Sequence, residues 1–117
     1  MVGACVAALM ARDERLAGWS IAVVEPAAPK APLAGAVDLR VSALSRASEL
    51  ILRHAGAWPL SAPEACPYSD MVVWDAAGRR DGRDVLRFSA AETGEPNLGH
   101  IADNQRVQWA LHQSPHV

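Results

Sequence analysis

The sequence predicts an α/β fold, and three features of its first half indicate why. Residues 4–16 carry apolar side chains at near-helical spacing, which favours a helix packed on a flat surface. Residues 21–24 form a continuous apolar run that ends at Glu25, the pattern of a buried parallel strand. A Pro- and Ala-rich loop over residues 26–36 then leads to a second helical pattern, for which Ser42 is the expected N-cap.

The rest of the chain predicts a β-hairpin followed by a strand and a helix. Gly56 is expected to end the second helix in a left-handed cap, and Pro59 and Pro63 predict an irregular segment after it. Two strand patterns, residues 71–75 and 85–90, flank the turn AAGRRDG. Further expected elements are a polar loop over 92–97, a strand over 99–102, and a helix over 104–112 that stops at Pro115.

Composition limits the classes of function. The chain has 117 residues, half of them hydrophobic, and a net charge of -2. These values fit one modest domain and give no basic surface for nucleic acid. No apolar run is long enough to span a membrane, and the two cysteines do not form a disulfide framework. A cytoplasmic location is therefore expected.

Gly3 and Glu25 stand at a spacing that occurs in dinucleotide-binding units. Gly3 lies 22 residues before Glu25, as the third glycine of a G-x-G-x-x-G turn lies before the acidic residue of the second strand. That glycine lets helix and sheet pack closely, and the carboxylate accepts hydrogen bonds from ribose hydroxyls. The first two glycines and the first strand would precede residue 1. By itself the pair also fits any αβ hairpin.

Three motifs in the second part of the chain stand in a characteristic order. They are DLRVSAL from Asp38, CPYSDMVVWD from Cys66 and LGHIADN from Leu98, and QWAL follows them. In their order and spacing they resemble the FAD-dependent hydroxylases that modify the aromatic ring of ubiquinone precursors. The resemblance covers nearly the whole chain. It implies that residues 1–117 form a partial FAD/NAD(P)-binding domain, Rossmann-like, without its first strand and with a β-hairpin insertion.

The same resemblance implies cofactor-binding roles for five residues. Gly3 matches the last glycine of the nucleotide loop, and Glu25 matches the ribose-binding carboxylate. Arg40 matches an arginine near the flavin and its pyrophosphate, where a guanidinium can fork onto phosphate oxygens. Asn104 and Gln108 match polar positions on the helix that leads away from the flavin. The alternatives are a solvated carboxylate, a surface arginine, a helix N-cap and an exposed polar side chain.

The sequence departs from the family pattern around the start of the last helix. Asp103 stands where glutamate is usual, and Gln105 and Arg106 are not in the usual order, so no role is assigned to Arg106. No catalytic residue and no metal site is expected. His112 and His116 have helical spacing, but Pro115 between them breaks a helix.

The resemblance implies a flavin monooxygenase as the parent protein. It would use FAD, NAD(P)H and O₂ to hydroxylate a polyprenylated phenol, and it could attach peripherally to a membrane-linked biosynthetic complex. Because motifs at both ends of the family pattern are missing, we expect a fragment that is inactive by itself and binds FAD weakly or not at all. The alternative is a non-catalytic α/β module used for packing or interaction.

Overall fold

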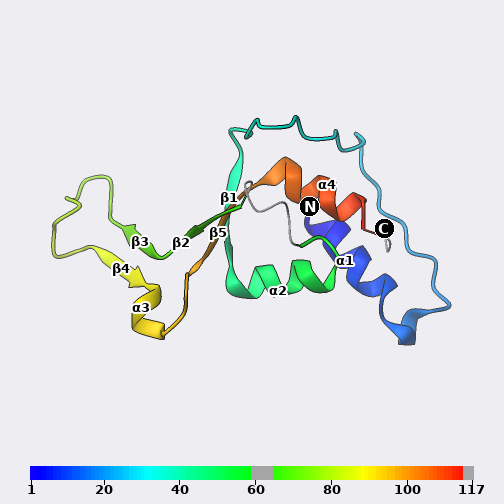
Figure 1. The fold of residues 1–117 in the computed structure, drawn as a ribbon, viewed down its shortest axis with the longest axis horizontal. Helices are drawn as coiled ribbons and strands as arrows, with labels where there is room; N and C mark the ends of the chain where they lie inside the picture. The colour runs from blue at the N-terminus through cyan, green and yellow to red at the C-terminus, as the bar shows by residue number, and fades with distance from the viewer. Residues whose placement is uncertain (59–64, 115–117) are drawn as a thin grey trace.

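The protein is mixed α/β in a computed structural model that describes residues 1–58 and 65–114. Figure 1 shows helices gathered on one side of a small sheet and a hairpin extending from the other. The elements in chain order are α1 (Val2–Ala11), the 3-10 turn η1 (Glu14–Leu16), β1 (Val41–Ser45), α2 (Arg46–His54), β2 (Ala65–Tyr68), β3 (Asp70–Val73), β4 (Leu86–Ser89), α3 (Ala90–Thr93), β5 (Gly99–Asp103) and α4 (Asn104–His112). Pro59, Pro63, Pro115 and His116 lie outside the described residues.

Both sheets are antiparallel. The larger has the order β1-β5-β2, with Val41 opposite Asp103 and Ala65 opposite Ala102. The smaller is the hairpin β3–β4, in which Met71 faces Phe88, so the expected hairpin is confirmed. The described residues contain no parallel strand pair, and the Rossmann-like arrangement stays a prediction.

The strand predicted over residues 21–25 is wrong. This segment has an extended backbone, but it belongs to the long loop between η1 and β1 (Figure 1). No backbone hydrogen bond joins it to another described residue. An extended segment becomes a β-strand only when a neighbouring strand pairs with its N–H and C=O groups. No described residue forms such a pair with residues 21–25. Val24 is accordingly 94% exposed.

The second helix begins later than predicted. Ser42 is not its N-cap, because this residue lies within β1, opposite Ala102 of β5. Ser45 is the cap, and its hydroxyl accepts a hydrogen bond from the backbone N–H of Ser48 at 3.2 Å. Pairing with β5 holds residues 41–45 extended until that point. At the other end Gly56 has φ 76°, which confirms the left-handed cap.

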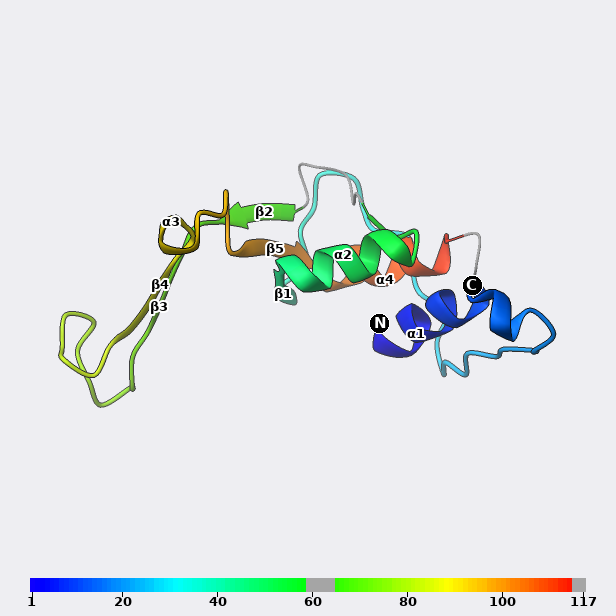
Figure 2. The same cartoon turned by 90° about the horizontal axis from the view of Figure 1, so that it is seen from below.

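Small side chains form the core between the helices and the larger sheet. The buried cluster consists of Ala4, Ala8, Leu52, Ala55, Ala57, Ala65, Ala102, Val107 and Leu111. The Ser114 hydroxyl donates to the Ala55 carbonyl at 2.7 Å, which ties the end of α4 to the end of α2. Figure 2 shows the β3–β4 hairpin and α3 well away from these helices. The molecule is therefore elongated, 55 × 32 × 27 Å.

Candidate functional site

A polar pocket lies beside the first turns of α4. Its volume is about 420 Å³, and the long loop before β1 supplies most of its wall. The lining residues are Met1, Glu25, Ala27, Ala28, Pro29, Lys30, Asp38, Arg40, Asn104, Gln105 and Gln108. Two carboxylates, two cationic groups and three amides thus converge from three separate parts of the chain.

Four of the five residues expected to bind cofactor line this pocket. Glu25 and Arg40 come from the loop and are exposed, whereas Asn104 and Gln108 come from α4 and are half-buried. On α4 the two amides are four residues apart and so share one face of the helix. The structure therefore brings together residues that are up to 83 positions apart in the chain.

Gly3 is not part of the pocket lining. It lies in the first turn of α1, where a Cβ atom added to it would meet no other atom within 4 Å. Close packing among the described residues therefore does not explain a glycine at this position. Its proposed contact with a nucleotide stays a prediction.

Hydrogen bonds fix the inner wall of the pocket. The backbone N–H of Asn104 donates to the carbonyl of Arg40 at 3.0 Å, so the loop joins the first residue of α4. The hydroxyl of Ser42 donates to the side-chain oxygen of Asn104 at 2.6 Å. This contact orients the Asn104 amide and leaves its NH₂ group available to donate to a ligand. The backbone N–H of Arg40 donates to Asp38 Oδ1 at 3.2 Å.

Two buried charged residues below the pocket received no role from the sequence. Asp103 caps α4 by accepting the N–H of Gln105 at 2.8 Å and that of Arg106 at 3.4 Å. Burial raises the pKa of Asp103, but three backbone N–H donors and the Arg106 charge outweigh it, so its pKa lies below the ordinary value. The i,i+3 spacing of Asp103 and Arg106 in the sequence is a signal for an ion pair on a helix. The spacing does not indicate that the pair is buried.

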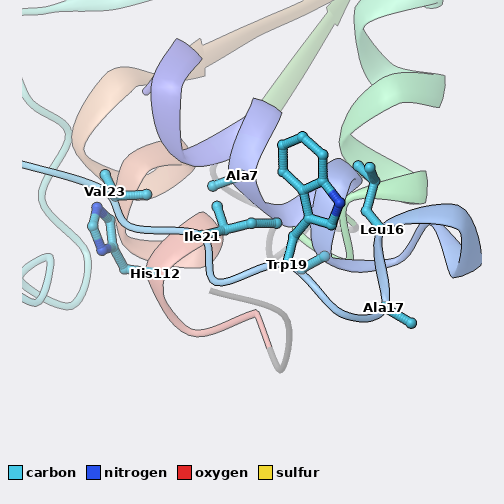
Figure 3. A pocket seen from close by; sticks show the side chains of 8 residues that line it. Ala7, Leu16, Ala17, Trp19, Ile21, Val23 and His112 are labelled. Atoms are coloured by element: carbon cyan, nitrogen blue, oxygen red, sulfur yellow. The ribbon is translucent and has the colours of Figure 1, made fainter.

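A second pocket of about 430 Å³ is lined mostly by apolar side chains. Figure 3 shows the side chains of Trp19, Ile21 and Val23 along the extended segment beside Ala7 of α1. His112 of α4 contributes the single titratable side chain of this lining. The polar side-chain groups of this lining are the His112 imidazole and the Trp19 indole N–H, and the remaining side chains are apolar.

The described residues contain neither a cluster of metal ligands nor a helix that could span a membrane. Residues 1–58 and 65–114 contain no group of three or more His, Cys, Asp or Glu side chains placed to hold a metal ion. Within the same residues no helix has the length and apolar character needed to cross a membrane. Cys5 and Cys66 are both free thiols.

The curated proteins similar to this chain include two ubiquinone hydroxylases. No protein-family model matches the chain. It is 32% identical over 116 residues to the 3-demethoxyubiquinol 3-hydroxylase of Escherichia coli (strain K12), an alignment covering 97% of this chain and 27% of that protein. It is 29% identical over 111 residues to ubiquinone hydroxylase UbiL of Rhodospirillum rubrum, covering 95% of this chain and 24% of that protein.

These similarities relate the chain to hydroxylases of ubiquinone biosynthesis. The relation extends over almost all of its residues, as the motif order predicted. The chain spans about a quarter of the length of the curated relatives it matches.

Proposed function

We propose that this chain supplies part of the FAD-binding domain of a ubiquinone-precursor hydroxylase, and that the pocket beside α4 is its contribution to the flavin site. The observation that carries the proposal is the convergence of Glu25, Arg40, Asn104 and Gln108 on one pocket. Sequence resemblance alone points to those four residues. Similarity to two ubiquinone hydroxylases supports the same assignment.

The chemistry of the pocket fits the sugar and phosphate portions of a flavin nucleotide. Arg40 and Lys30 supply positive charge for a diphosphate, and a guanidinium can form two parallel hydrogen bonds to phosphate oxygens. Glu25 can accept hydrogen bonds from ribose hydroxyls. The amides of Asn104 and Gln108 can donate to either group. At about 420 Å³ the pocket suits one portion of the nucleotide, and other residues would hold the remainder.

In this assignment the chain's residues bind and orient the cofactor. Bound flavin would supply the activation of O₂ for insertion of one oxygen atom into an aromatic ring. Arg40 would neutralise phosphate charge, and Asn104, oriented by Ser42, would fix the direction of the nucleotide. We assign no catalytic residue to this chain.

The proposed substrate is a polyprenylated phenol, with NAD(P)H as the reductant. The E. coli relative's name specifies hydroxylation of 3-demethoxyubiquinol, which supports a ring of this class. Because such a substrate resides in a lipid bilayer, peripheral attachment to a membrane-linked biosynthetic complex forms part of the proposal. A titration of the purified chain with lipid vesicles tests it.

FAD titration of the isotopically labelled chain, followed by NMR, tests the proposed pocket. We expect weak binding that shifts the amide signals of Arg40, Asn104 and Gln108, because the charged groups at the pocket are exposed. Riboflavin lacks the diphosphate and the adenosine of FAD, so it should not shift these amide signals. An FAD response confined to other parts of the chain would contradict the proposal.

Arg40→Ala should weaken this FAD response by about tenfold or more, because it removes a charge-assisted contact to phosphate. The matched control is Arg83→Ala, which removes an exposed arginine from the hairpin turn, remote from the pocket. Arg53 would be a poor control, since it holds the buried carboxylate of Glu49 at 2.7 Å. Equal losses in Arg40→Ala and Arg83→Ala would show that net charge, not position, governs binding.

A non-catalytic interaction module is the second candidate function. The β3–β4 hairpin favours it, because Met71, Phe88, Val73 and Leu86 form two cross-strand pairs whose side chains are all at least 39% exposed. An apolar sheet face of this kind is typical of a surface that packs against another segment. Sedimentation of the purified chain, with and without charged substitutions at Leu86 and Phe88, distinguishes the two functions.

A further inference from the structure

The loop that carries Arg40 is held by a buried carboxylate. Asp103 ends β5 and is 2% exposed. Besides capping α4, it accepts the backbone N–H of Asp38 through Oδ2 at 2.8 Å. One carboxylate thus joins the first turn of α4 to a loop residue 65 positions earlier in the chain. The joined residue lies two positions before Arg40.

Arg106 holds an earlier part of the same loop. Its side chain is 6% exposed, and Nη2 donates to the carbonyls of Leu33 at 2.8 Å and Ala36 at 2.6 Å. Its Nε lies 3.7 Å from Asp103 Oδ2, so the guanidinium and carboxylate neutralise each other inside the protein. Residues 33–40 contain no helix or strand, and these bonds give the loop a defined course.

We propose that Asp103 and Arg106 are positioning residues for the nucleotide pocket: together they clamp the 33–40 loop to the N-terminus of α4 and so set Arg40 against Asn104. Neither Asp103 nor Arg106 lines the pocket, so other side chains would contact the ligand. The backbone bond from Asn104 to Arg40 at 3.0 Å lies where the clamped loop meets the helix. The inference rests on the proposed function for the identity of the ligand.

General physical chemistry supports a positioning role over simple stabilisation. Replacing a buried ion pair by apolar residues is often neutral or stabilising, so such a pair is weak evidence for stability. Here both charges are directed at backbone groups of one loop, and that loop carries two residues that line the pocket, Asp38 and Arg40. Fixing a loop before a ligand arrives lowers the entropy lost on binding.

The test uses the full chain with Asp103→Asn, Asp103→Glu and Arg106→Lys, each followed by NMR. In Asp103→Asn, hydrogen exchange at the Asp38 amide should accelerate about tenfold or more, as expected when a charge-assisted bond is weakened. FAD affinity should fall by a similar factor. Asp103→Glu keeps the charge and should recover part of both effects. Asp81→Asn, at an exposed carboxylate of the hairpin turn, is the matched control.

Arg106→Lys provides a second variant if Asp103→Asn does not fold. Lysine keeps the charge but cannot hold two carbonyls with one planar group, so loop signals near Leu33 and Ala36 should change while α4 remains helical. Unchanged exchange at Asp38 in folded Asp103→Asn, or FAD affinity equal to wild type in both folded variants, would overturn the inference. If wild type fails to bind FAD, the proposed function fails, and the exchange measurements still decide whether the clamp orders the loop.

Discussion

Gly99 is required by the close approach of two strands. It opens β5 and faces Ser45 of β1, and a Cβ atom added there would lie 2.0 Å from the Leu44 carbonyl oxygen. Real Cβ atoms do not come so close to backbone, so a side chain would force the strands apart. The sequence showed this glycine as part of the LGHIADN motif, but the reason for it appears only in the strand register.

Gly99→Ala should therefore destabilise the protein by about 3 kcal/mol or more, at the upper end of overpacking effects. Gly3→Ala is the matched control, because a Cβ atom at that position meets nothing within 4 Å. Alanine also favours a helix over glycine, so stability there should stay equal or rise by up to about 1 kcal/mol. Urea unfolding of both variants measures the difference, and similar losses would contradict the packing argument.

At the scale of elements, local patterns predicted more than long-range pairing. Helical periodicity identified α2 and α4, and alternation identified the hairpin, because these signals depend on neighbours in sequence. The apolar run over 21–25 looked more like a strand than residues 41–45 did. Yet 41–45 pair with β5, and 21–25 find no partner among the described residues. Strand formation depends on what lies alongside, which periodicity does not encode.

In the candidate site, too, the sequence predicted some residues and missed others. Resemblance selected Glu25, Arg40, Asn104 and Gln108, and the fold brings these four to one pocket. It assigned no role to Arg106, although the guanidinium of this residue donates to two carbonyls that lie 70 and 73 residues away in the chain. Backbone carbonyls carry no side-chain signature, so no sequence motif could have identified this contact.

Ser45 and Ser42 provide a test of where α2 begins. Ser45→Ala should cost about 1 kcal/mol, the usual value of a lost N-cap, and should speed hydrogen exchange at the Ser48 amide. Ser42→Ala removes a hydroxyl of the same type, but its bond goes to Asn104, so Ser48 exchange should not change. Faster Ser48 exchange in Ser42→Ala would restore Ser42 as the cap.

At the scale of the whole molecule, two buried carboxylates join its parts. Asp103 links the loop to α4, while Glu49 of α2 holds Arg53 at 2.7 Å and lies 3.3 Å from His100 of β5. The Arg53 hydrogen bond is the largest influence on Glu49, and with the nearby positive charges it outweighs burial and lowers the pKa of that carboxyl. A small core of alanines leaves much of the tertiary organisation to such contacts.

Acid should therefore unfold this protein by protonating these two groups. Each has a folded-state pKa below its ordinary value, 3.8 for Asp103 and 4.5 for Glu49, so the unfolded chain binds more protons in acid. The stability they contribute is complete above those values and is lost as the pH falls through the folded-state pKa values. Urea unfolding measured from neutral to acid pH should show a steep fall in the free energy of unfolding. In Glu49→Gln and in Asp103→Asn this fall should be smaller, although both variants should be less stable than wild type at neutral pH. Asp13 and Asp81 also have lowered pKa values, through hydrogen bonds from Arg15 and Arg79, but both ion pairs lie at the surface, with Asp13 half-buried and Asp81 exposed. High salt should screen those surface pairs and leave the buried ones largely intact, so a pH dependence that disappears in salt would assign acid sensitivity to the surface instead.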